Sequence, residues 1–292
     1  WFIFWLVVTV FEIVFSGGLP IIWLLSGSEK TYFDFGLPSV HGLANGLVSA
    51  LSSVSFYIYL CEGHRNYLLY SMMIIVWGFV AVTRQIVIVN LLQFVIVYYM
   101  FKPPNVVGMI KSVSIFVVFV LLFGWLGDAR TGADKFVGLA MPTADYPDYL
   151  PSGILWVYMY AVTPLMNLIN TINISCGCES IYFGNTIAPL LPSVIRNLFI
   201  NTEKIEKGDV ISEAFNVSTA FVDPYTDLGY VGVLMFTFGI AFYLVNAWRR
   251  KDLRSVLIYS VLSQSLILTI FYNHFFSLPV ISQILWINIF LK

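Results

Sequence analysis

The chain has 292 residues, of which 59% are hydrophobic and only 11% are charged, and its formal net charge is −1. A soluble domain carries about a quarter of charged residues. The composition therefore excludes a water-soluble enzyme, a disordered segment and a nucleic-acid-binding protein. It indicates an all-α, polytopic membrane protein that forms one domain over residues 1–292.

The beginning of the chain lies inside an apolar run, with Trp1 at the position of an initiator methionine. No basic segment and no cleavage site for a signal peptidase accompany this run. We interpret it as the interior of a transmembrane helix, and we expect the chain to be truncated at its N-terminus.

About ten apolar runs reach or approach the roughly 20 residues that a helix needs to cross a bilayer. They are continuous rather than alternating, so they predict helices and not the strands of a barrel. In chain order, the runs are 1–15, 37–60, 67–82, 86–101, 109–126, 154–174, 183–200, 228–247, 256–273 and 276–291.

The orientation of the spans follows from the basic residues, which gather in cytoplasmic loops. The strongest marker is the segment 249–254, which we place inside the cell. Counting spans from this segment puts the following basic residues inside: Arg65, Lys102, Lys111, Arg249, Arg250, Lys251, Arg254 and Lys292. The long stretches 16–36, 127–153 and 201–227 then lie outside, and long loops of this kind usually carry function.

Three arginines on the predicted outer side stand out. Arg84 lies at the turn of an apolar hairpin whose arms, about 16 residues each, are short for a full crossing, so we expect this turn to be recessed. Arg130 is flanked by glycines, and Arg196 closes an apolar helix. Structural alternatives stay open: contact with lipid headgroups for Arg84, pairing with Asp128 for Arg130, and interfacial anchoring for Arg196.

The three arginines together predict a site for a phosphate-rich ligand, because a planar guanidinium binds phosphate oxygens in pairs. A lipid-linked diphosphate fits better than a nucleotide, since the site opens away from the cytoplasm. The chain has no Walker loop, dinucleotide fingerprint, zinc-protease motif or nucleophile elbow. Cys176 and Cys178 supply too few ligands for zinc, so we expect no metal and no cofactor.

Candidate groups for moving a proton also lie on the outer side. His41, at the outer start of a helix, is a possible base near neutral pH, and a structural histidine is an equal alternative. Asp227 enters a span and is either a second candidate base or a helix cap. We predict Asp223, Tyr225 and His274 as contacts with a glycan, although His274 also fits a structural role in its tight turn.

Several segments resemble bacterial oligosaccharide repeat-unit polymerases, the Wzy-type enzymes of O-antigen and capsule assembly. The resemblance covers most of the chain from Glu12 onward. The segments are 35–43 (FGLPSVHGL), the hairpin at Thr83 and Arg84, 127–132 (GDARTG), 163–168 (TPLMNL), and 216–219 (NVST) followed by 227–229 (DLG).

The resemblance implies a many-helix fold like that of C-type glycosyltransferases, working without metal on the periplasmic face of the bacterial inner membrane. The implied reaction moves a growing glycan from undecaprenyl diphosphate onto the next lipid-linked repeat unit. Arg84, Arg130 and Arg196 would hold the diphosphate, Arg130 would also take part in catalysis, and His41 or Asp227 would deprotonate the acceptor.

The implied partners are undecaprenyl-diphosphate-linked glycans, the lipid bilayer, and the chain-length regulator and flippase of the same pathway. Two alternatives stay open. One is a flippase or transporter of lipid-linked oligosaccharides, and the other is the related ligase that joins a finished glycan to the lipid-A core.

Overall fold

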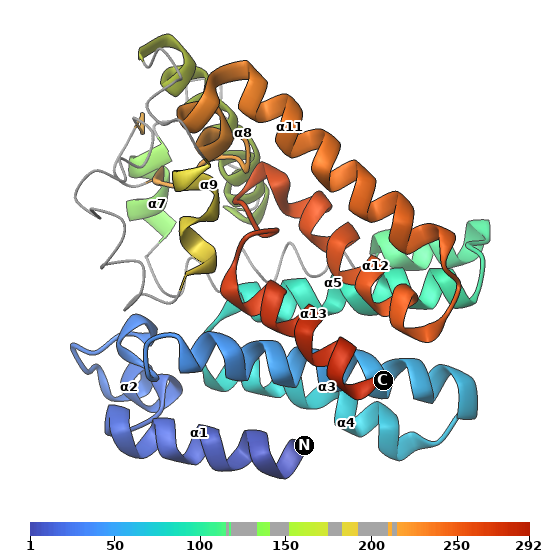
Figure 1. Cartoon of the computed structure of the whole chain (residues 1–292). Helices are drawn as coiled ribbons and strands as arrows, with labels where there is room; N and C mark the ends of the chain where they lie inside the picture. Colours follow the sequence, from blue (N-terminus) through green and yellow to red (C-terminus); the bar gives the residue numbers. More distant parts are fainter. Residues whose placement is uncertain (115–116, 118–132, 141–151, 175–182, 192–209, 212–214) are drawn as a thin grey trace.

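The computed structural model describes residues 1–114, 117, 133–140, 152–174, 183–191, 210–211 and 215–292, which form helices and connecting segments without a strand (Figure 1). The longer helices are α1 (Phe2–Ser16), α3 (Val40–Glu62), α4 (Arg65–Val80), α5 (Arg84–Phe101), α8 (Ser152–Ile174), α11 (Val222–Arg249), α12 (Leu253–Ile267) and α13 (Leu278–Phe290). The shorter ones are α2 (Pro20–Ser26), η1 (Tyr32–Asp34), α7 (Ala133–Ala140), α9 (Gly184–Ile187), η2 (Ala188–Leu190) and η5 (Leu268–Ile270).

Among the described residues, four helical segments are long and apolar enough to cross a membrane. They are Phe2–Ser26, Val40–Glu62, Val222–Arg249 and Leu253–Ile270, and two shorter apolar helices accompany them, Gln85–Phe101 and Leu278–Phe290. The length and composition of these helices therefore confirm the prediction of an all-α, multi-pass membrane protein.

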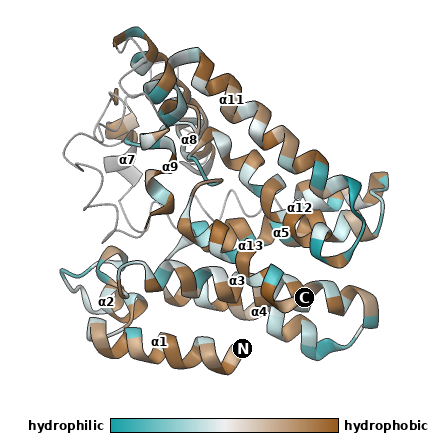
Figure 2. Ribbon diagram, in the orientation of Figure 1, coloured by the Kyte–Doolittle hydropathy of each residue, from teal (hydrophilic) through white to brown (hydrophobic). Residues whose placement is uncertain are grey.

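The surface of the helices differs from that of a soluble protein. Large apolar side chains are exposed along α1 and α11, for example Val7, Phe11, Phe238 and Phe242. Most of the residues along these two helices are hydrophobic (Figure 2). A hydrocarbon solvent accounts for this pattern, because it imposes no penalty on exposed apolar area.

The helices pack as neighbours in a bundle. α3 lies between α4 and α13 and also contacts α1 and α5, while α12 packs on α5 and α11 (Figure 1). The predicted hairpin is confirmed, since α4 ends at Val80 and α5 begins at Arg84.

A cluster of polar side chains lies inside this bundle, and we call Ser53, Gln93, Gln264 and Gln283 the glutamine cluster. Gln283 donates from Nε2 to Gln93 Oε1 at 2.7 Å, and Gln93 donates from Nε2 to Gln283 Oε1 at 3.1 Å. Ser53 Oγ donates to Gln93 Oε1 at 2.9 Å. All four side chains are buried, so their mutual hydrogen bonds join α3, α5, α12 and α13 within the apolar bundle.

One predicted span is interrupted, as the prolines in its apolar run indicate. The described part of the run 183–200 is not a continuous helix, because the four-residue α9 is followed by η2 and by an extended backbone at Leu191. Pro189 is the second residue of η2, and Pro192 follows Leu191. Prolines end a helix because they lack the amide hydrogen that the next turn requires.

The predicted outer loop 16–36 folds into α2 and η1, which we call the cap. α2 contacts α4, and the ring of Phe35 lies 5.9 Å from that of Trp77 near the end of α4. Trp23 and Phe35 are both buried in the same apolar cluster as Trp77. The cap therefore covers the end of α4 that precedes Arg84, and the predicted recess of that turn stays a prediction.

Candidate functional site

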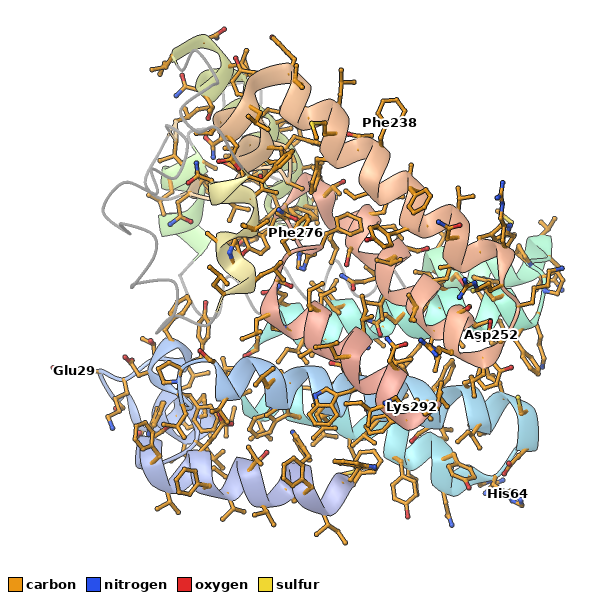
Figure 3. All side chains as sticks on the ribbon, in the orientation of Figure 1. Glu29, His64, Phe238, Asp252, Phe276 and Lys292 are labelled. Carbon is orange, nitrogen blue, oxygen red and sulfur yellow. The ribbon has the colours of Figure 1, made fainter. Side chains whose placement is uncertain are left out.

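The two ends of the bundle differ in chemistry. Glu29 lies at one end, whereas His64, Asp252 and Lys292 lie at the opposite one (Figure 3). The charge-based topology assigns the end with Glu29 to the outside of the cell, and we call it the outer end.

A buried carboxylate organises part of the outer end. Glu12 of α1 is 1% exposed, and its Oε1 accepts a hydrogen bond from the backbone nitrogen of Leu37 at 3.3 Å. Ser16, one turn farther along α1, accepts from the backbone nitrogen of Gly36 through Oγ at 2.8 Å. α1 thus holds the segment that leads into the start of α3.

His41 lies on the first turn of α3, and Glu12 is its charged partner. Nδ1 of His41 is 3.1 Å from Oε2 of Glu12, and the imidazole side chain is 26% exposed. On the other side of the ring, Nε2 of His41 is 2.9 Å from Nδ2 of Asn45. Trp77 of α4 then donates from Nε1 to Asn45 Oδ1 at 3.0 Å.

Glu12, His41, Asn45 and Trp77 therefore form one hydrogen-bonded chain across α1, α3 and α4, which we call the His41 network. The network lies among apolar rings, with Phe35 edge-on to His41 at 5.3 Å between ring centroids. Partly exposed and backed by a buried carboxylate, the imidazole has the surroundings of a group that exchanges protons.

Gly36 leaves the space that the imidazole of His41 occupies. Its φ of +88° favours glycine, and a Cβ at this position would lie 2.8 Å from Cγ of His41. Only a residue without a side chain lets the backbone approach the ring so closely.

A second group of polar residues surrounds Asp227, whose side chain is fully buried. Its Oδ1 accepts from the backbone nitrogen of Asn185 at 2.9 Å, and its Oδ2 accepts from the backbone nitrogen and the hydroxyl of Thr186 at 2.9 and 2.7 Å. The carboxylate thereby accepts hydrogen bonds from backbone amides at the start of α9. The helix-capping interpretation fits Asp227, although the helix it caps is α9 and not its own.

α11 is broken directly after Asp227. Leu228 and Gly229 have non-helical backbone angles, with φ +60° and ψ −148° at Gly229, so the helix consists of a short outer piece and a long apolar piece. Asp223 and Tyr225 lie on the outer piece, where Tyr225 is buried and Asp223 is half-buried. Broken membrane helices occur where the backbone lies in a protein interior or beside a cavity.

His274 lies between η5 and α13 and is buried. Burial lowers the pKa of His274 from about 6.5 to about 4, because the charged form loses its hydration. The imidazole is therefore neutral at physiological pH, which matches the structural interpretation better than a role as a proton donor.

The two polar groups lie at the same end of the bundle. Asn273, next to His274, donates from Nδ2 to the carbonyl oxygen of Thr186 at 3.4 Å and so joins this turn to the Asp227 group. A few residues later, Leu278 packs against Gly42 beside His41, where a Cβ would lie 3.0 Å from Leu278 Cδ2.

The structure thus brings Asp227 close to the turn of His274 and places His41 on the neighbouring helix. It places Arg84 at the first position of α5, although its side chain lies outside the described part of the chain. Arg130 and Arg196 also lie outside the described residues, so the predicted convergence of the three arginines stays a prediction. No group of three or more metal-ligating residues occurs in the part that the structure describes.

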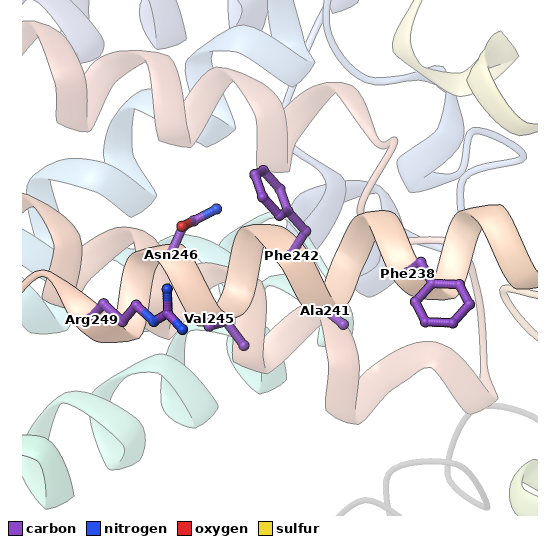
Figure 4. Close-up of a pocket in the computed structure, with 6 residues that line it drawn as sticks. All are labelled: Phe238, Ala241, Phe242, Val245, Asn246 and Arg249. Carbon is purple, nitrogen blue, oxygen red and sulfur yellow. The ribbon is translucent and has the colours of Figure 1, made fainter.

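A shallow groove lies elsewhere, along the exposed face of α11 (Figure 4). It has a volume of about 510 Å³ and is lined by Phe238, Ala241, Phe242, Val245, Asn246 and Arg249. All of these residues belong to one helix, and none is a predicted site residue. The groove runs toward the basic inner end and not toward the His41 network.

Comparison of the chain with known protein families, characterised proteins and solved structures finds no match. The site therefore has to be judged on its own geometry. The sequence analysis missed Glu12, Asn45, Trp77, Thr186 and Asn273 as partners of the candidate residues. The position of Glu12 within an apolar run of the sequence could have identified it, since a carboxylate in a membrane helix is costly unless it has a partner.

Proposed function

We propose that this protein is a membrane glycosyltransferase that lengthens polyprenyl-diphosphate-linked glycans at the outer end of its helical bundle. The observation that carries the proposal is the contact of His41 with the buried Glu12. Ionisable groups within membrane helices are rare and usually functional, and this pair combines a partly exposed proton acceptor with a group that stabilises its charged form.

His41 acts as the base in the proposed reaction. The acceptor hydroxyl gives its proton to His41 as its oxygen forms a bond to the anomeric carbon of the donor glycan. The bond between that carbon and the diphosphate oxygen breaks, and its electron pair leaves with the diphosphate. Attack from the side opposite the leaving group inverts the anomeric carbon.

We assign the base to His41 rather than Asp227 because both carboxylate oxygens of Asp227 already accept hydrogen bonds. Arg84, Arg130 and Arg196 stabilise the charge on the departing diphosphate, as fixed cationic donors do for developing anions. Asp223 and Tyr225 contact the glycan in this proposal, whereas the buried His274 holds the turn beside them.

In this proposal, the protein lies in a bacterial inner membrane with its site facing the periplasm. Its fold is like that of C-type glycosyltransferases. The substrates are undecaprenyl-diphosphate-linked repeat units, delivered by a flippase, and a chain-length regulator acts on the same product. The likeness of the segments around His41, Arg84 and Asp227 to repeat-unit polymerases supports this choice among glycosyltransferases.

Purified protein in liposomes with lipid-linked repeat units tests the proposal. We expect the wild-type chain to produce a ladder of lengthened glycans and Arg84→Ala to slow their formation at least about 100-fold, since single stabilising donors contribute about 10²–10³ in rate. Undiminished polymer from Arg84→Ala would remove Arg84 from the mechanism. Absence of polymer from the wild-type chain would contradict the proposal itself.

A second candidate is a transporter of lipid-linked oligosaccharides, favoured by the glutamine cluster. Transporters carry polar groups near the bilayer midplane, and Ser53, Gln93 and Gln283 each lie near the middle of their helices. In the same liposomes, movement of labelled lipid between leaflets without lengthening of the glycan would favour the transporter.

A further inference from the structure

The hydrogen bonds of the His41 network determine which nitrogen of His41 carries the proton. Trp77 Nε1 is only a donor, so Asn45 must present its oxygen to the indole. The amide nitrogen of Asn45 then faces His41 and donates to Nε2. Nε2 is consequently an unprotonated acceptor, and the neutral ring carries its hydrogen on Nδ1, which donates to Glu12.

From this geometry we infer that Glu12 and Asn45 are positioning residues that keep His41 ready to accept a proton at Nε2, with Asn45 holding the place that the acceptor hydroxyl takes. The inference rests on the proposed function and adds which nitrogen of His41 is free to accept the proton before the reaction. When the hydroxyl binds, it replaces the Asn45 amide on Nε2, and its proton then moves to this nitrogen. Glu12 stabilises the imidazolium ion that results, as a carboxylate does behind a catalytic histidine.

Glu12 suits this role because both of its oxygens accept hydrogen bonds. One accepts from the backbone nitrogen of Leu37 and the other from His41. A glutamine at this position has only one oxygen and can satisfy only one of the two donors. If the glutamine oxygen accepts from Leu37, the glutamine amide donates to Nδ1 of His41. The ring hydrogen then lies on Nε2, where two donors, this N–H and the Asn45 amide, face each other.

Within the described part of the chain, few other charged groups lie near His41. Among the described residues of the cap, Lys30 donates to the carbonyl oxygen of Ser16 and Asp34 accepts from Thr31. α4 and α13 contribute no charged side chain at their outer ends, and α5 contributes Arg84 at its first position. His274, in the turn before α13, is neutral. Glu12 is therefore the charged group in hydrogen-bond contact with the ring.

Two variants test the inference by their pH–rate profiles for glycan lengthening. Glu12→Gln is expected to slow transfer at least about 100-fold at every pH, within the range of about 10²–10⁴ that a general base contributes. Asn45→Asp presents acceptors to both Trp77 and His41 and stabilises the imidazolium ion. We expect it to slow transfer at least about tenfold at pH 7 and to recover as the pH rises.

Thr9→Val is the matched control. Thr9 is buried on α1 one turn before Glu12, and its hydroxyl has no hydrogen-bond partner among the residues that the structure describes. This variant should keep the rate and pH profile of the wild-type chain. Thermal unfolding of each variant in detergent shows whether it is folded.

Nitrogen NMR of labelled histidines adds a readout that is independent of activity, with the His41 signal identified by its loss in His41→Gln. The expected result is a protonated Nδ1 and an unprotonated Nε2 in the wild-type chain, exchanged in Glu12→Gln. A wild-type ring protonated at Nε2 would overturn the inference. Folded Glu12→Gln and Asn45→Asp variants that lengthen glycans at the wild-type rate across the pH range would overturn it as well. A wild-type chain with the expected tautomer but no polymer would instead overturn the proposed function, and with it the catalytic use of this ring.

Discussion

At the scale of single residues, Glu12 has the largest influence on the outer end. Its position in an apolar run marks it as unusual, and the sequence also identifies His41 as a candidate base. The contact between them could not be predicted, because it joins residues 29 positions apart on different helices. The partners Asn45 and Trp77 carry no sequence signal of their own, since a buried amide and a buried indole are common in any helical bundle.

Gly36→Ala is predicted to disable the site by displacing His41. The added methyl group would collide with the imidazole at 2.8 Å, so the ring must leave its place beside Glu12. We expect glycan lengthening to fall at least about tenfold, measured in liposomes, because a base out of hydrogen-bond reach loses its catalytic contribution.

Gly27→Ala is the control for Gly36→Ala. Gly27 has a similar positive φ of +66°, but a Cβ there meets nothing within 4 Å. The Gly27→Ala variant therefore has the same kind of backbone strain as Gly36→Ala but no collision with a side chain. Equal losses of activity in the two variants would show that strain in the cap, and not the position of His41, limits the reaction.

His274 is predicted to make the folded state sensitive to acid. Its pKa is lowered to about 4 by burial, so below about pH 6.5 the unfolded chain binds a proton that the folded chain does not. The contribution of His274 to stability should be constant above pH 7 and should fall by roughly 3 kcal/mol between pH 6.5 and 4.

Unfolding in detergent at a series of pH values measures the contribution of His274. His274→Gln should lose this part of the pH dependence, whereas the same change at the exposed His64 should retain it. An unaltered pH dependence in His274→Gln would show that other groups produce the acid sensitivity.

At the scale of elements, the apolar runs predicted the positions of most long helices because hydrocarbon requires satisfied backbone hydrogen bonds. In the run 183–200, Pro189 and Pro192 indicate an interrupted helix, and the structure confirms this interruption in the described part of the run. The break of α11, in contrast, was not predicted. Leu228 and Gly229 lie in an apolar stretch, and the break depends on tertiary contacts such as those that hold Asp227 at the start of α9.

Gly229→Ala is predicted to disturb the outer piece of α11. The backbone angles of Gly229 lie in a region that residues with a side chain rarely adopt. The substitution should favour a continuous helix, pull Asp227 away from Thr186, and lower the melting temperature by several degrees along with the rate of transfer.

Gly239→Ala, on the same helix, provides the comparison. A Cβ at Gly239 meets nothing within 4 Å, and alanine is the better helix former, so this variant should be neutral or slightly stabilising. A Gly229→Ala variant as stable and active as Gly239→Ala would show that the break has no part in the site.

At the scale of the whole molecule, composition and charge distribution were sufficient to predict a multi-pass helical protein with unlike ends. The structure adds a bundle with apolar side chains outside and hydrogen-bonded polar groups inside. Neither the glutamine cluster nor the His41 network is visible as a motif, because each is assembled from single residues of three or four helices. The central claim is that the outer end binds a lipid-linked diphosphate and acts on its glycan.

A structure of the protein in a lipid disc with an undecaprenyl-diphosphate-linked repeat unit tests this claim most directly. We predict density for the diphosphate beside Arg84 at the start of α5, with the glycan directed toward His41. Density at the basic inner end, or along the groove between Phe238 and Arg249, would contradict the account.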